Sequence, residues 1–261
     1  MVSRPFDVSP FSMSNRYAVR WGRQPNAKVA IPKIHDRQMQ ALRNLGILKL
    51  ASKIQLALQL NPGNIRRGKK NVDFLKDKGV LIEHTLFSKE TNQTIPFYSL
   101  SDQMRELFGE QPLAKMYTID ILKHLLLSQF HVKFLAIDEN TAPKIFPSPF
   151  DGCFEILGLE FRVAVIRDKV QLEKVHNHLK FMDEKMRTLI VIEDLEYARM
   201  LLHLGKKADG FRIITDHNLL KSDLCNSFYR VQDADWYPEY IEPFDISKKQ
   251  PEENHSIAAQ S

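Results

Sequence analysis

A Pro-Gly break between two helical patterns restricts the fold of this chain more than any other feature. Asn61-Pro62-Gly63 separates an apolar helical pattern at about 49–60 from a second pattern at about 63–78. The second pattern ends at Gly79, a residue type that commonly follows the last turn of a helix. Two short helices joined by a tight turn are typical of a helix-turn-helix.

The segments on either side of these helices complete the pattern of a winged helix. Asp36 is a suitable N-cap for a preceding helix, because apolar residues follow it at helical spacing. Residues 80–87 and 97–100 read as strands, and the polar, turn-rich stretch between them predicts a hairpin. Three helices followed by a hairpin predict a winged helix-turn-helix over residues 33–110.

The third predicted helix has a strongly basic first half. In a helix-turn-helix, side chains near the start of this helix reach base edges, while flanking basic residues hold phosphates. Lys89, at the tip of the predicted hairpin, is placed to touch the DNA backbone or the minor groove. A solvated polar face on a core helix is the alternative interpretation. The predicted DNA-binding residues of the helix are Asn64, Arg66, Arg67, Lys69 and Lys70.

The charge of the chain is unevenly distributed. Residues 1–110 hold 18 Lys and Arg against 9 Asp and Glu, whereas the remainder holds 19 against 23. Such an asymmetry indicates a half that faces nucleic acid, joined to a neutral or acidic half. Residues 1–32 are basic and irregular, which predicts either an arm that lies along phosphates or a disordered tail.

The rest of the chain predicts a mixed α/β domain over residues 113–240. A long amphipathic helix at 113–130 is interpreted as the first core helix of this domain, with a domain connector or a dimer contact as alternatives. A disordered tail is expected at 245–261. The other predicted elements are strands at 131–137, 152–157, 161–166, 188–192 and 210–215, helices at 169–186 and 194–204, and a Pro-rich loop at 138–149.

This order of elements is typical of restriction-endonuclease-like nucleases, in which two carboxylates hold a metal ion and a lysine assists the attacking water. Asp151 opens a predicted strand in a suitable position, and Glu160 and Arg162 follow on the next strand. Arginine does not release its proton, so it is a poor substitute for that lysine. The pattern therefore predicts a catalytically degenerate core without a metal. In the alternative reading, these three residues carry metal-dependent cleavage.

No other catalytic or cofactor-binding pattern is complete. His176 and His178 face different sides of one predicted helix and do not form a metal site. Cys153 and Cys225 are too few for a disulfide framework, and no glycine-rich phosphate loop occurs. Neither a secretory signal nor an apolar run long enough to span a membrane is found. A cytoplasmic protein without cofactor, membrane partner or evident small-molecule substrate is expected.

A family resemblance agrees with this interpretation. The stretch from Arg37 to Ala51, together with the segment RRGKKNVDFLKDKGVL that ends at Leu81, resembles the winged helix of the replication-relaxation family. In that family a nuclease-like mixed domain follows, with Pro-Asp-Gly before its first strand pair; this chain has the longer Pro149-Phe150-Asp151-Gly152. The resemblance covers about residues 33–220. It implies DNA binding in the replication, transfer or regulation of a plasmid or another mobile element.

The favoured hypothesis is a non-enzymatic protein that recognises double-stranded DNA. It would act as a transcriptional regulator or as a plasmid replication or transfer accessory factor. The predicted long helix at 113–130 leaves a homodimer open. Two alternatives belong to other classes: a metal-dependent DNA nuclease targeted by its winged helix, and a protein-binding adaptor whose winged helix does not meet DNA.

Overall fold

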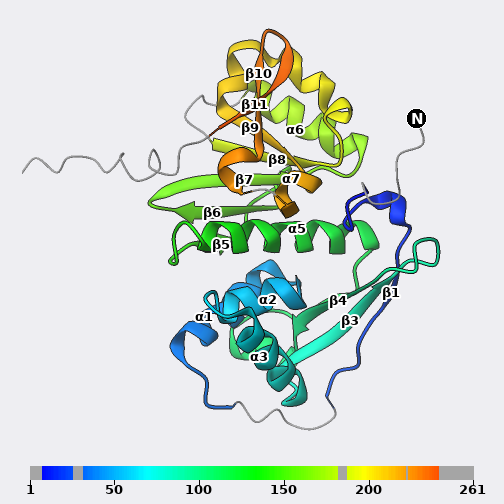
Figure 1. The fold of residues 1–261 in the computed structure, drawn as a ribbon, viewed down its shortest axis with the longest axis vertical. Helices are drawn as coiled ribbons and strands as arrows, with labels where there is room; N and C mark the ends of the chain where they lie inside the picture. The colour runs from blue at the N-terminus through cyan, green and yellow to red at the C-terminus, as the bar shows by residue number, and fades with distance from the viewer. Residues whose placement is uncertain (1–7, 26–31, 182–186, 222, 241–261) are drawn as a thin grey trace, which may run out of the picture.

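Two β-sheets lie one above the other, with the long helix α5 (Thr118–Leu135) between them (Figure 1). The computed structural model describes residues 8–25, 32–181, 187–221 and 223–240. The chain is a mixed α+β protein, which confirms the predicted class at this coarse level. The expected disordered tail at 245–261 lies outside the described residues.

The first part of the chain packs helices on a small antiparallel sheet. The strands are ordered β1-β3-β4-β2, so the hairpin formed by β3 and β4 lies at the centre. The elements are the 3-10 turn η1 (Met13–Asn15), β1 (Ala18–Arg20), α1 (Asp36–Leu48), β2 (Ala51–Ser52), α2 (Lys53–Leu60), α3 (Ile65–Asp77), β3 (Leu81–Phe87), β4 (Thr94–Leu100) and α4 (Asp102–Leu107).

Local sequence explains where these helices begin and end. The Ser52 hydroxyl accepts from the Gln55 backbone N–H, and the Gln55 side chain accepts from the Ser52 N–H at 2.8 Å, which is a reciprocal cap for α2. Gly79 adopts a φ of 72° just past α3. This left-handed conformation commonly ends a helix, and glycine adopts it without steric strain because it has no Cβ atom. The N-cap of α1 is His35, so the prediction that Asp36 caps this helix is wrong by one residue.

The second part of the chain forms a seven-stranded sheet of order β11-β10-β9-β8-β7-β6-β5. Strands β7, β8 and β9 are parallel, and the remaining neighbours are antiparallel. The elements are β5 (Ala142–Lys144), β6 (Gly152–Ile156), β7 (Leu159–Val165), α6 (Lys169–Phe181), β8 (Arg187–Ile192), the 3-10 segment η2 (Leu195–Gly210), β9 (Phe211–Thr215), α7 (Asp216–Lys221), η3 (Leu224–Asn226), β10 (Phe228–Gln232) and β11 (Asp235–Glu239).

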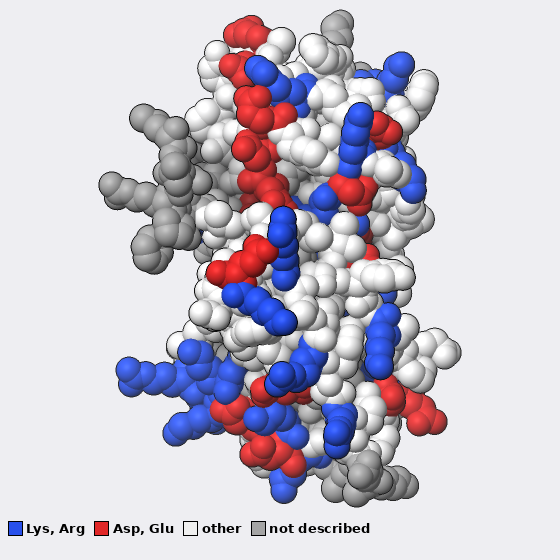
Figure 2. Space-filling model, turned by 90° about the vertical axis from the view of Figure 1, so that its right-hand side faces the viewer, with Lys and Arg blue, Asp and Glu red and all other residues white. Residues whose placement is uncertain are grey.

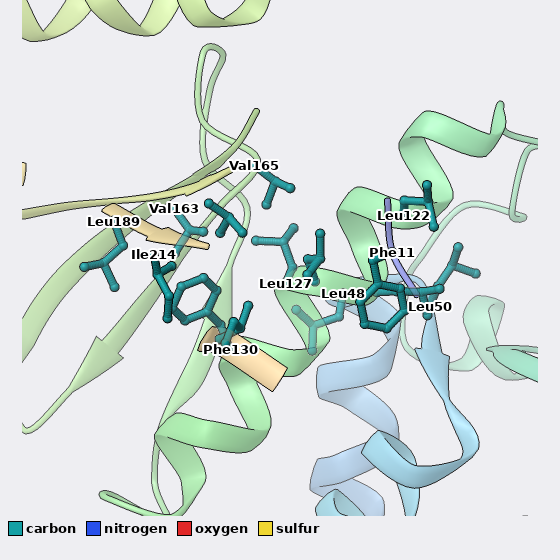
Figure 3. Close-up of a cluster of buried hydrophobic side chains, with 14 of the residues drawn as sticks. Phe11, Leu48, Leu50, Leu122, Leu127, Phe130, Val163, Val165, Leu189 and Ile214 are labelled. Atoms are coloured by element: carbon teal, nitrogen blue, oxygen red, sulfur yellow. The ribbon is translucent and has the colours of Figure 1, made fainter. Parts of the chain in front are cut away.

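One apolar core runs through both parts of the molecule. Side chains of α5, among them Leu122 and Phe130, contact residues of both sheets in a single buried cluster. In Figure 3, Phe130 points toward Ile214 of β9, whereas Leu122 lies near Phe11, further along the helix. The opposite face of the larger sheet is covered by α6 and η2 in a separate cluster. Helix α5 therefore supplies core to both sheets.

Several predicted elements around this core are wrong. The expected strand at 131–137 is mostly the end of α5, because the helix runs on to Leu135 and buries His131 and Phe134. The predicted loop at 138–149 contains β5, and the predicted helix at 194–204 lies within η2. The hairpin of β6 and β7 and strands β8 and β9 appear where the sequence predicts them, within a few residues. Helix α6 begins as predicted, and residues 182–186 of the predicted helix lie outside the described residues.

The N-terminal lead-in is folded over residues 8–25. Phe11 and Tyr17 are buried in the shared core, and β1 pairs with β3 in antiparallel register. The alternative interpretation of the lead-in as a disordered tail is therefore wrong for residues 8–25. Residues 1–7 and 26–31 of the predicted arm lie outside the described part of the chain.

Candidate nucleic-acid interface

Helix α3 is held so that one face is buried and the other faces solvent. Val72 and Leu75 pack into a core cluster with α1 and α2. Gly68 is also buried, because α3 approaches α2 closely at this point. At the N-terminal end, the Asn64 side-chain carbonyl accepts from the Arg67 N–H at 3.0 Å, so the helix start is fixed by a sequence-encoded cap.

The exposed face carries the predicted cations. Among the described residues, no ion pair or side-chain hydrogen bond ties any of them. Asp73, one turn further on, is neutralised by Lys53 at 2.5 Å. The first half of α3 is thus a concentration of uncompensated positive charge. The exposed residues in this half are Arg66, Arg67, Lys69 and Lys70, next to the exposed Asn64.

Figure 2 shows the same division of charge over the molecular surface seen from the β1 side. Blue side chains gather over the lower half, which holds α3 and the small sheet, and one group projects at the lower left. Red side chains form a column over the upper half. Both signs of charge occur in each half of this face, and blue predominates over the lower half.

Lys89 lies in the tight connection between β3 and β4, as predicted. The Ser88 N–H donates to the Gln93 carbonyl at 2.9 Å, and the Thr91 N–H donates to the Ser88 hydroxyl at 3.2 Å. These bonds order the loop, and the Lys89 side chain is exposed on it. The hairpin therefore presents a cation at its tip.

An ion-pair network joins α3 to the hairpin. The Tyr98 hydroxyl donates to the Glu83 carboxylate at 2.8 Å, and Lys76 lies 3.3 Å from the same carboxylate oxygen. Burial raises the pKa of Tyr98, and the neighbouring Glu83 raises it further, so the phenol stays protonated as a donor. This network fixes the angle between the basic helix and the root of the hairpin.

The predicted nuclease residue Asp151 is engaged by the protein itself. Its carboxylate accepts from the Val165 N–H at 2.7 Å and from the Gln171 amide at 2.9 Å, and Lys123 lies 3.6 Å away. Burial raises the pKa of Asp151, whereas Lys123 and these hydrogen bonds oppose the rise. An open hollow of about 460 Å³ lies beside it, lined also by Asp168.

The structure separates Asp151 from Glu160. The chain pairs Gly152 with Val163, while Glu160 pairs with Glu155, three positions further along the strands. Asp151 precedes Gly152, so it lies four positions from Glu155, which corresponds to about 13 Å along the strands. Arg162 lies 3.7 Å from Glu160 and stacks on the Phe146 ring at 4.5 Å. Within the described ranges, no group of three His, Cys, Asp or Glu side chains is close enough to hold a metal ion.

A buried charge cluster was missed by sequence reasoning. Arg167 holds Asp216 through two hydrogen bonds of 2.7 and 2.8 Å, and Glu193 lies 3.8 Å from the same guanidinium. Burial raises the pKa of Asp216 to about 6, and Arg167 opposes that rise. Each residue directly follows, or nearly follows, one of the parallel strands β7, β8 and β9. The sequence signal for this cluster is that each of three apolar strand patterns is followed by a charged residue, because the carboxyl ends of parallel strands lie at the same edge of a sheet.

Glu193 also holds the N-terminal lead-in. Its carboxylate accepts from the Ser12 hydroxyl at 2.8 Å and from the Met13 N–H at 2.9 Å. The cluster therefore connects the carboxyl ends of the parallel strands to the segment that continues into β1. Among the described residues, the Arg167 Nε atom at the centre of the cluster is buried and has no hydrogen-bond partner.

The cysteines show no sign of a nucleophilic role. Burial raises the pKa of the Cys153 thiol to about 11, and burial also raises the pKa of the half-buried Cys225.

No helix of the described residues is long and apolar enough to cross a membrane. No family model, no curated protein and no solved structure matches the chain.

Proposed function

We propose that the chain binds double-stranded DNA through a winged helix-turn-helix, in which α3 is the recognition helix and the β3–β4 hairpin is the wing. One observation carries the proposal. The first half of α3 exposes four cations that no described acidic residue neutralises, directly after the turn that separates it from α2. A half-helix of this kind gains free energy by replacing the counterions of the phosphate backbone.

The geometry of the helix start supports base contact as well. Because the Asn64 carbonyl oxygen caps the Arg67 N–H, the amide nitrogen is left as a donor toward the ligand side. Arg66 and Arg67 each offer a planar donor fork that fits guanine edges in the major groove. Lys89 on the wing reaches the flanking backbone. Recognition thus combines base contacts from α3 with phosphate contacts from α3 and the wing.

The second half acts, in this proposal, as a non-catalytic platform for assembly or partner binding. A catalytic role is disfavoured because Asp151 accepts hydrogen bonds from Val165 and Gln171, lies beside Lys123, and is separated from Glu160 along the strands. Together with the resemblance to the replication-relaxation family, this favours a regulator or an accessory factor of plasmid replication or transfer.

Fluorescence anisotropy of a labelled duplex at two salt concentrations, with and without Mg²⁺, tests the proposal. The wild type is expected to bind in a salt-dependent manner and to leave the duplex intact on a gel. The Arg66→Ala/Arg67→Ala variant is expected to bind more weakly. Lys180→Ala/Lys221→Ala removes two exposed cations from the other half of the molecule and serves as the matched control.

Three outcomes would contradict the proposal. Equal affinity of the Arg66/Arg67 variant and the wild type would remove α3 as the recognition helix. Mg²⁺-dependent cleavage that Asp151→Ala abolishes would identify a nuclease. Absence of DNA binding at low salt, together with salt-insensitive binding to a protein, would identify an adaptor.

A further inference from the structure

The lead-in adds a third strand to the hairpin that we assign as the wing. Strand β1 runs antiparallel to β3 along its outer edge, with Val19 opposite Leu86 and Arg20 opposite Thr85. Figure 1 shows β1 beside β3 on the side of the sheet away from β4. The wing is therefore three strands wide, and its outermost strand ends in an arginine.

The direction of Arg20 follows from the alternation of side chains along β1. Val19 packs against the core shared with α5, as does Trp21. Because neighbouring side chains on a strand point to opposite faces, Arg20 points to the other face of the sheet, together with Thr85.

This other face is the one on which α3 lies. Tyr98 belongs to the same buried cluster as Val72 and Leu75 of α3, and it pairs across the strands with Glu83. Glu83 in turn contacts Lys76 of α3. Thr85 follows Glu83 by two residues, so it projects from the same face, and Arg20 lies across from it. Arg20 is thus on the α3 side of the wing, further toward the tip than the α3 contact.

Arg20 is exposed and uncommitted. Its side chain makes no ion pair or hydrogen bond with the residues that the structure describes. Arg16, four residues earlier in the same lead-in, differs, because its guanidinium lies 3.0 Å from the Glu90 carboxylate. The neighbouring acidic side chain on the Arg20 face, Glu83, is already neutralised by Lys76.

We propose that Arg20 is a phosphate-binding residue of the interface, and that β1 presents it to the backbone of the same duplex that α3 and Lys89 contact. The inference rests on the proposed DNA binding. It extends the interface to a segment that lies outside the helix-turn-helix in sequence.

Salt-dependent anisotropy of Arg20→Ala, with Arg16→Ala as the matched control, tests this assignment in the full chain. Loss of one phosphate contact is expected to weaken binding by about three- to tenfold and to lower the salt slope by about one unit. Arg16→Ala removes the same charge from the same lead-in, but its guanidinium is held at Glu90, so it is expected to lower the slope less than Arg20→Ala does. Arg20→Lys retains the charge and is expected to restore most of the slope, as a backbone contact requires.

The outcomes separate this inference from the function on which it rests. If Arg66→Ala/Arg67→Ala weakens binding while Arg20→Ala matches the wild type, the DNA-binding proposal stands and the role of Arg20 is overturned. If Arg20→Lys loses as much affinity as Arg20→Ala, the phosphate contact is overturned. If the wild type binds no DNA, both proposals fall. Because the Arg20 side chain is exposed, we expect Arg20→Ala to unfold at the midpoint temperature of the wild type. An unchanged midpoint excludes a folding defect as the cause of weaker binding.

Discussion

The backbone of Gly68 in α3 lies directly against the Ala57 carbonyl of α2. A Cβ atom placed on Gly68 would come within 2.1 Å of that oxygen, far inside any normal contact. This contact holds Gly68 of α3 against α2, so the basic side chains on the opposite face of α3 are exposed to solvent. The position of the candidate recognition helix thus depends on the absence of one methyl group.

Gly68→Ala is therefore expected to destabilise the protein. A backbone carbonyl cannot move aside as a flexible side chain does, so the cost should reach the upper end of overpacking, about 3 kcal/mol. Urea unfolding followed by circular dichroism measures it. Gly63→Ala is the control: nothing lies within 4 Å of its added Cβ, and its stability should be unchanged or slightly higher. Equal midpoints for the two variants would contradict the contact.

The buried imidazole of His131 predicts acid destabilisation. Burial lowers its pKa from the ordinary 6.5 to about 4, although a hydrogen bond with the Thr141 carbonyl opposes the shift. Between these values the unfolded chain binds more protons, so the contribution is complete above pH 6.5 and falls as the pH drops toward 4. The loss amounts to about 3 kcal/mol.

His131→Gln checks this contribution, because the amide can still donate to Thr141 but does not titrate. The free energy of unfolding of the variant should depend less on pH between 6.5 and 4 than that of the wild type. His203→Gln removes an exposed imidazole as the control. If His131→Gln shows the same acid loss as the wild type, His131 is not the group responsible.

Replacing Arg66 or Lys89 by alanine is expected to weaken DNA binding in two different ways. If Arg66 contacts a guanine, its replacement by alanine should cost about 1–3 kcal/mol on the preferred site and reduce discrimination between sequences. Lys89→Ala should weaken binding to all duplexes alike and lower the salt slope by about one unit. Selection of preferred sequences, followed by titration of matched and scrambled duplexes, separates the two effects. A sequence-independent loss in both variants would assign Arg66 to phosphates.

Glu193 is expected to control the local stability of the lead-in. Two hydrogen bonds join its carboxylate to Ser12 and Met13, and bonds to charged groups contribute about 1.5–3 kcal/mol each. Glu193→Ala should speed hydrogen exchange in β1 more than in β8. Glu196→Ala, which removes a carboxylate that pairs with the exposed Arg199 and with no other described residue, is the control. Unchanged exchange in β1 would show that Phe11 and the strand pairing hold the segment alone.

The sequence predicted those features that depend on short-range signals. The turn at Asn61-Pro62-Gly63 and the left-handed Gly79 frame α3, and its cations are exposed as expected. Strand β1 could not be predicted, because the partner of Val19 is Leu86, distant in sequence and carrying no local signal.

The remaining errors have the same physical origin. The stretch from His131 to Ile137 is short and rich in residues that favour strands, so its pattern does not distinguish a strand from a buried helix. Contacts made by His131 and Phe134 with the larger sheet decide in favour of the helix. The Arg167, Glu193 and Asp216 cluster exists only once three strands lie parallel.

Helix α5 has a consequence for how this chain can be divided. It has apolar contacts on both sides, and the Ser128 hydroxyl and the Leu125 carbonyl bond to Leu50 and Gln55 across the boundary. A gene fragment that stops after α4 would leave Leu50 and Phe97 facing water, and one that starts after α5 would bare the underside of the larger sheet. Each half would need another apolar surface to cover its exposed core, so we expect neither half to fold alone.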